Sequence, residues 1–169
     1  EIATELANQR SRDAGNPKKD VVIFADTSPN PVVNSYRSQN IVVGSLSQID
    51  APLMANIDSN LKTSPSDIGG IYRIAKIKVI LSLKGKSAPG DEFSILIPGG
   101  EVDGHRVVFE DYRIETKLDS ESVYYLSPVP SELFGIKNLW VVDDRLIYDS
   151  ISKTASALDQ TYTIDDLRT

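Results

Sequence analysis

The chain has no cysteine in its 169 residues, and it has one histidine, one tryptophan and one methionine. Without cysteine there is no disulfide framework, no thiol nucleophile and no thiolate-bound metal. A Ser-His-Asp triad would have to use the single histidine, His105, and a zinc site with several histidine ligands is excluded. No apolar run approaches the roughly 18 residues that span a bilayer, so the sequence predicts no transmembrane segment.

An excess of basic residues is also lacking, because the net charge is −6. This balance makes a general nucleic-acid-binding protein an unfavoured interpretation. The bases are concentrated, however, between Ile71 and Lys86, where there is no acid, whereas acids outnumber bases between Asp91 and Glu121. If these regions pair as strands, their charges neutralise each other across the sheet. The alternative is a basic strip that binds a ligand.

The clearest structural signal is a β-hairpin from Ile71 to Gly100. Apolar residues occupy one parity of its first half and lysines the other, which is typical of a strand with one buried face. Turn-forming residues follow at 85–90. The pattern predicts a buried set of Ile77, Val79, Leu81, Phe93, Ile95 and Ile97. It predicts an exposed set of Lys76, Lys78 and Lys84.

Other strands are predicted at 40–49, 106–109 and 122–127 from their apolar and aromatic runs. Gly44, in the middle of the first of these, indicates a bulge. The strands predicted at 138–142 and 145–148 flank Asp143-Asp144, which we expect at the tip of a tight hairpin. Short helices are predicted at 31–38, which begins with proline, and at 163–168, where Thr163 is the expected N-cap.

The N-terminal 30 residues are expected to form an arm separate from a β-barrel domain at 31–169. The arm is predicted to contain a weak helix at 1–14 and an apolar strand at 21–25. Because exposed sheet edges recruit strands, we expect the arm's strand to pair with a barrel edge in its own chain or in a neighbour. Pairing with a neighbour would give self-association.

Three stretches share features with a known family: 40–46, the hairpin from Ala75 to Gly100 with its Lys-Gly turn and paired glycines, and 122–126. Together they resemble an OB-fold-like β-barrel module of secreted or cell-surface proteins of Gram-positive bacteria. The resemblance covers roughly 40–169 and departs from the family at 131–137, where a glycine-rich segment is expected. It implies an exported accessory module and supplies no catalytic residues. The expected fold is mainly β, a small five- or six-stranded OB-like Greek-key barrel with short terminal helices.

Candidate chemical groups are few. His105 lies in a polar turn, where a solvated histidine is the simpler interpretation. Asp103, Glu110 and Asp111 would offer oxygen ligands for calcium if the loop after Gly100 folds back, although Asp-Gly is also an ordinary turn. Asp143-Asp144 and Asp165-Asp166 have structural explanations, at a hairpin tip and in the first turn of a helix.

The aromatic residues offer another kind of site. Tyr124, Tyr125, Trp140 and Tyr148 lie in adjacent predicted strands. Successive residues of a strand point to opposite faces, so one of Tyr124 and Tyr125 is expected in the core and the other in solvent. Trp140 is expected in the core; in the alternative it belongs to an exposed row that stacks on sugars or bases.

The sequence therefore predicts a non-enzymatic extracellular or surface-attached module that contacts a protein partner or a wall polymer, with no catalytic, cofactor-binding or metal-binding residue assigned. One alternative is an OB-type barrel that binds an oligosaccharide or single-stranded nucleic acid. A second is a carboxylate-dependent hydrolase. For that hydrolase the long polar loop at 50–70, with Asp58 and Asp67, would be the lid.

Overall fold

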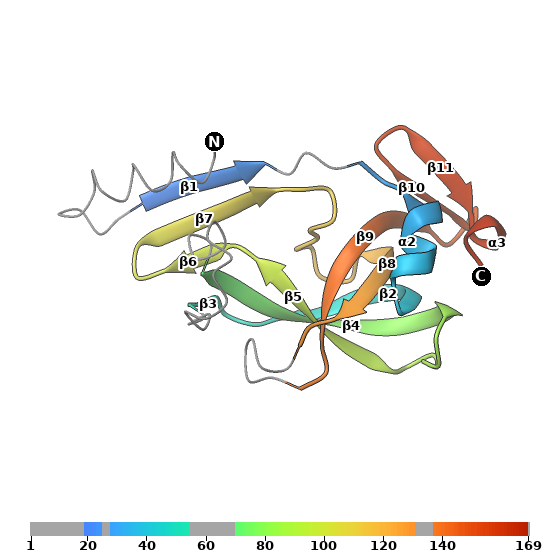
Figure 1. Ribbon diagram of the computed structural model, residues 1–169, viewed down its shortest axis with the longest axis horizontal. Coiled ribbons are helices and arrows are strands. Elements are labelled where there is room, and N and C mark those ends of the chain that lie inside the picture. The colour runs from blue at the N-terminus through green and yellow to red at the C-terminus, as the bar shows by residue number, and fades with distance from the viewer. Residues whose placement is uncertain (1–18, 25–27, 55–69, 131–136, 169) are drawn as a thin grey trace.

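The computed structural model describes residues 19–24, 28–54, 70–130 and 137–168 (Figure 1). Its strands are β1 (Lys19–Phe24), β2 (Asn40–Ile49), β3 (Leu53–Met54), β4 (Ile71–Lys84), β5 (Glu92–Pro98), β6 (Gly100–Val102), β7 (His105–Glu110), β8 (Glu121–Pro128), β9 (Leu139–Asp149), β10 (Thr154–Ala157) and β11 (Gln160–Thr163). Its helices are α2 (Pro31–Arg37) and α3 (Ile164–Leu167). No helix within these residues is long and apolar enough to cross a membrane. The helix predicted at 1–14, and Asp58 and Asp67, lie outside the described residues.

Five strands close into an OB-like barrel in the order β2, β4, β5, β9 and β8, and β8 pairs back with β2. All of these pairs are antiparallel except β5 with β9. The hairpin predicted from the alternating pattern forms β4 and β5, which pair from Tyr72↔Pro98 to Lys78↔Glu92. The predicted fold class is confirmed.

The barrel interior is filled by side chains of the parity that the sequence indicates. Its buried residues are Val42, Leu46, Ala75, Ile77, Val79, Ile95, Ile97, Tyr124 and Leu126. Phe93 is half-buried at the rim of this cluster, and Leu81 is half-buried against a second cluster instead. Lys78 is exposed as predicted, but Lys76 and Lys84 are partly buried. For Lys84 the reason is that its ammonium group caps α2.

Gly44 lies at an irregularity of β2, as its position in the middle of the strand predicts. The pairing register of β2 with β4 shifts between Val43 and Gly44. A Cβ atom at this position would lie 3.3 Å from the carbonyl oxygen of Lys78, closer than most real contacts. Glycine therefore permits the close approach of the two strands where β2 bends around the barrel.

A second apolar cluster covers the outer face of the barrel where β10, β11 and α3 pack. It contains Ile41, Val43, Leu83, Val123, Tyr125, Leu146, Ala155, Ala157, Ile164 and Leu167. Tyr124 is 1% exposed and Tyr125 is 0% exposed, so the prediction that one of them reaches solvent is wrong. The reason is that both faces of β8 are covered, one by the barrel interior and the other by this second cluster.

The strand predicted in the N-terminal arm is β1, and it pairs within its own chain. Its partner is not a barrel strand, however: β1 runs parallel to β7, which pairs with β6 in a separate three-stranded sheet beside the barrel (Figure 1). The β6–β7 hairpin turns at Asp103 and Gly104, whose φ angles are 52° and 82°. An Asp-Gly turn with two positive φ angles is the type I′ turn that hairpins favour.

The predicted hairpin tip at Asp143-Asp144 is wrong, because β9 runs unbroken from Leu139 to Asp149. Its pairing with β8 shifts register, with Tyr125 opposite Asp144 but Leu126 opposite Val142. Asp143 is thus the extra residue of a β-bulge, and the two acids lie inside the fold, not at a turn.

Candidate functional site

The bulge in β9 places two neighbouring carboxylates beneath α2. The side chain of Asp144 is 0% exposed and accepts hydrogen bonds from Asn34 Nδ2 at 2.9 Å and from the backbone N–H of Asn30 at 2.9 Å. It also accepts from Tyr112 Oη at 2.8 Å and from the backbone N–H of Arg145 at 2.9 Å. Four donors compensate this buried charge, which would otherwise be very unfavourable.

Asp143 holds the other end of α2. It accepts from Ser38 Oγ at 2.7 Å and from Ser127 Oγ, and Arg37 Nη2 lies 3.9 Å from its carboxylate. Lys84 Nζ then donates to the carbonyl oxygens of Ser35 and Ser38 at 2.7 and 2.8 Å, where the helix leaves unpaired carbonyls. The two acids and this lysine therefore fix both ends of α2 on the barrel.

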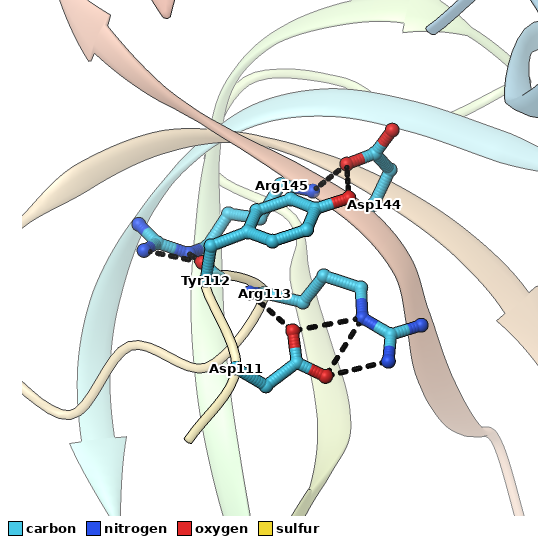
Figure 2. A network of polar contacts seen from close by, with 5 residues as sticks. All are labelled: Asp111, Tyr112, Arg113, Asp144 and Arg145. Atoms are coloured by element: carbon cyan, nitrogen blue, oxygen red, sulfur yellow. Dashed lines mark hydrogen bonds and ion pairs between the residues drawn. The ribbon is translucent and has the colours of Figure 1, made fainter. Parts of the chain in front are cut away.

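Residues 111–117 join this network, and Figure 2 shows Tyr112 in contact with both Asp144 and Arg145. Arg145 is 7% exposed, and its guanidinium donates to the carbonyl oxygen of Tyr112 at 3.0 Å from Nε and 2.7 Å from Nη2. Its Nη1 donates to Ser122 Oγ at 2.9 Å and lies 3.4 Å from Glu115. Tyr112 thus binds Asp144 through its hydroxyl and Arg145 through its carbonyl.

The same segment contains a bidentate ion pair. Arg113 Nε lies 3.0 Å from both carboxylate oxygens of Asp111, and Nη2 lies 2.5 Å from one of them. Burial disfavours the charged form of Asp111, but the hydrogen bonds and charge of Arg113 outweigh it, so the pKa of Asp111 is lowered. For Tyr112, burial and the hydrogen bond to Asp144 both raise the pKa.

On the other side of this segment lies a cavity of about 510 Å³, between the β6–β7 hairpin and the barrel end. It is lined by Arg73, Arg106, Glu101, Glu110, Phe109 and Ile114, among others. Gly99 forms part of the wall with a φ of 102°, and a Cβ atom there would lie 2.9 Å from the carbonyl oxygen of Val107. The wall at this point is therefore bare backbone.

Arg73 differs from every arginine of the network. Its Nε is buried without a hydrogen-bond partner, and it forms no ion pair with the residues that the structure describes. Burial alone lowers its pKa, and no acid acts in the opposite direction. A smaller cavity of about 190 Å³ lies against Arg113, Glu115 and Tyr124 at the same end of the barrel.

The outer side of α2 is apolar and exposed. Val32 is 68% exposed, Val33 is 55% exposed and Tyr36 is 85% exposed. Tyr36 lies four residues after Val32 and three after Val33, so these side chains are neighbours on the helix surface. We call them the α2 face.

The structure does not bring the proposed calcium ligands together. Asp103 lies at the tip of the β6–β7 hairpin, while Glu110 ends β7, whose five steps from His105 span roughly 17 Å at the rise of a β-strand. Asp111 is bound by Arg113. Within the described ranges there is no group of three or more histidine, cysteine or acidic residues that could hold a metal ion.

The remaining candidates have structural positions. His105 is the first residue of β7 and is half-buried. Asp165 and Asp166 lie in the first turn of α3, where Thr163 Oγ1 accepts from the N–H of Asp166 at 3.2 Å. Trp140 is half-buried against the interior cluster and meets Phe93 edge-to-face at 5.3 Å. Tyr124 and Tyr125, one of which the alternative placed in an exposed aromatic row, are both buried, so neither presents a stacking surface.

Sequence reasoning missed the residues that organise the site: Asp143, Asp144, Arg145, Tyr112 and Arg73. One signal was available for the first three. Three successive charged residues stand between Val142 and Leu146 without the glycine or asparagine that tight hairpin turns favour. A continuous strand with buried, compensated charges fits that pattern. For Arg73 the signal was its position in β4: it has the same parity as the interior residues Ala75 and Ile77, near the end of the strand.

No protein-family model matches the chain, and no curated protein matches it. The resemblance to Gram-positive surface modules therefore stays a prediction. What can be inferred about function comes from the geometry above.

Proposed function

We propose that this chain is a non-enzymatic binding module that works outside the cell, at or near the surface, and that its α2 face contacts a protein partner. The observation that carries the proposal is the exposed apolar row of Val32, Val33 and Tyr36 on a helix fixed at both ends. Apolar patches rimmed by polar residues mark interaction surfaces, and tyrosine is prominent among residues that dominate binding energy.

The way α2 is held supports this role. A helix of seven residues is too short to be stable alone, so its position depends on tertiary contacts. Here those contacts include buried carboxylates and a lysine cap, which set the position of α2 in addition to burying Pro31 and Asn34. The α2 face is therefore presented in a fixed orientation, which lowers the entropic cost of binding.

The surroundings of the α2 face indicate the partner's chemistry. Helix α3 lies beside α2 (Figure 1) and carries two exposed acids. The side chain of one of them, Asp165, is 93% exposed. The chain as a whole has a net charge of −6. We expect a protein surface whose apolar side chains are flanked by basic ones, because complementary charge speeds encounter and sets specificity.

The partnering of the acids favours binding over hydrolysis. Asp143 and Asp144 hold α2, and the lowered pKa of Asp111 keeps that carboxylate ionised and bound to Arg113. A general acid needs a pKa near the working pH, which is the opposite arrangement. The burial of both Tyr124 and Tyr125 likewise favours a protein partner over a sugar or single-stranded nucleic acid.

The proposal is tested by binding of fluorescently labelled protein to intact Gram-positive cells, to the same cells after protease treatment, and to purified wall sacculi. We expect saturable binding to intact cells that protease abolishes. The triple variant Val32→Ser, Val33→Ser, Tyr36→Ser should bind at least about tenfold more weakly. The control variant Ile151→Ser, Leu158→Ser, at two exposed apolar positions outside α2, should bind like the wild type.

Three results would overturn the proposal. Equal binding to protease-treated cells and sacculi would identify a wall polymer as the partner, release of wall fragments would identify a hydrolase, and no binding to cells would remove the surface role.

Self-association through β1 is tested separately, by sedimentation with and without residues 1–30. The structure describes β1 as an edge strand paired only with β7, so its other edge is the one a neighbour would use.

A further inference from the structure

The geometry points to a second binding site: the cavity between the β6–β7 hairpin and the barrel end, where Arg73 would bind the carboxylate of an apolar ligand. This site is separate from the α2 face and does not depend on the proposed function. The hairpin lies beside one end of the barrel, whereas α2 lies at the other (Figure 1).

The cavity has the size and lining of a ligand site. Its volume of about 510 Å³ falls within the range of small-molecule pockets, about 300–1,000 Å³. Pro52, Val107, Phe109 and Ile114 supply apolar walls, and charged side chains, among them Arg73, line the rest of the cavity. Such a mixed lining suits a molecule with an apolar body that ends in a charged group.

Arg73 supplies the polar group. A guanidinium that is removed from water without a partner is costly, and natural proteins compensate such charges with acids or hydrogen bonds. Arg73 Nε is buried without a hydrogen-bond partner, and no acid pairs with this partly buried side chain among the described residues. Its lowered pKa reflects the same loss of hydration. The compensation that is missing from the protein is what a bound anion would provide.

The other charged residues that line the cavity indicate which class of anion would bind. Arg106 stands directly opposite Glu101 in the β6–β7 register, so its charge has an acidic neighbour. Glu110 also lines the cavity, and Asp111 is bound to Arg113. Because Glu101 and Glu110 are acidic, a doubly charged phosphate would be repelled more strongly than a singly charged carboxylate. Arginine also matches a carboxylate in a bidentate geometry.

An apolar carboxylate has two sources, a free small acid and the C-terminus of a peptide. The test uses NMR titration of ¹⁵N-labelled protein with 3-phenylpropanoate, with its amide, with the peptide Ala-Ala-Phe carrying a free or an amidated C-terminus, and with inorganic phosphate. We expect shifts at Gly99, Phe109 and the Arg73 Nε–H for at least one free carboxylate. The amides should bind at least about tenfold more weakly.

Three variants test whether Arg73 itself is responsible for the binding. Arg73→Met should weaken carboxylate binding at least about tenfold, with Arg73→Lys intermediate, whereas Lys78→Met, at an exposed lysine of β4 that does not line the cavity, should change affinity less than about twofold. Circular dichroism verifies that each variant is folded. Tighter binding by the free acid or by the peptide identifies the source. Equal binding of the amides, retained binding by Arg73→Met, tighter binding of phosphate, or no shift with any probe would each overturn the site.

Discussion

Two arginines that lie against residues 111–117 have opposite surroundings. Arg145 is buried, and its guanidinium reaches the carbonyl of Tyr112, the hydroxyl of Ser122 and the carboxylate of Glu115. Arg73 is half-buried, and its Nε finds no partner among the described residues. The comparison distinguishes two roles for a buried charge. Arg145 stabilises the fold through its partners, whereas Arg73 has an unpaired donor that could bind a ligand.

The difference arises from the segment between β7 and β8. Residues 111–117 have no regular secondary structure, and they turn their polar groups toward β9 rather than toward β4. Tyr112 and Glu115 compensate Arg145, and Asp111 is neutralised within the segment by Arg113. No acid of this segment is left for Arg73, which lines the cavity on the segment's other side.

The largest effect is expected from Asp144→Ala, which removes the acceptor of four donors. The buried groups of Asn34 and Tyr112 would be left without their partner, so the free energy of unfolding should fall by about 3–5 kcal/mol. Urea unfolding measures it. The control Asp159→Ala, at an exposed turn position, should change stability by less than about 0.5 kcal/mol. Similar small losses for both variants would show that Asp144 is not an anchor.

Asp143→Ala should cost about 2 kcal/mol, less than the loss at Asp144. The hydroxyls of Ser38 and Ser127 rotate and can find other acceptors, whereas the donors around Asp144 are fixed. Because Asp143 holds the C-terminal end of α2, amide exchange at Ser38 should accelerate, since that N–H bonds to the carbonyl of Asn34. Unchanged exchange at Ser38 would contradict this role.

Tyr112→Phe should lower the free energy of unfolding by about 1.5 kcal/mol, the value of one hydrogen bond to a charged group. The backbone carbonyl that binds Arg145 remains, so the network should survive. Thermal and urea unfolding measure the loss. A cost as large as that of Asp144→Ala would mean that the whole 111–117 segment depends on this hydroxyl.

The smallest effect is a pH dependence in the alkaline range. Burial raises the pKa of Tyr112 and Tyr125, with further contributions from Asp144. Their folded forms stay protonated where unfolded tyrosine, with a pKa of about 10, ionises. The two protonated tyrosines therefore stabilise the folded state fully below about pH 10. This contribution is lost as the pH rises toward the pKa values of the tyrosines in the folded protein. The hydroxyl of Tyr125 has no hydrogen-bond partner among the described residues. The variant Tyr125→Phe removes this ionisable group, so the urea midpoint should depend less steeply on pH. An unchanged slope would contradict this assignment.

The sequence contains most of the information needed to predict the barrel. The period of two in β4 and β5 assigns Ile77, Val79, Ile95 and Ile97 to the interior, and Gly44 marks the bulge in β2. These predictions succeed because each depends on backbone geometry and local pattern. The same logic fails at Tyr124 and Tyr125, because a period of two predicts which residues share a face but not whether that face is covered.

The candidate site was much less predictable. Two adjacent acids are common in turns, and the burial of Asp143 and Asp144 depends on donors more than 100 positions away in the chain, on α2. Such long-range compensation has no local signature in a single sequence. Arg73 is similar, since its distinguishing property is the lack of a partner in three dimensions.

Urea unfolding of Arg145→Met and Arg73→Met, side by side and without ligand, tests the central comparison most directly. Arg145→Met leaves the Tyr112 carbonyl without its guanidinium donor and removes the ion pair with Glu115, so the free energy of unfolding should fall by about 3–5 kcal/mol. Arg73→Met removes a side chain whose Nε is buried without a partner in the described part of the chain, so stability should stay the same or rise. Similar losses for the two variants would contradict the account, because Arg73 would then be a structural charge like Arg145.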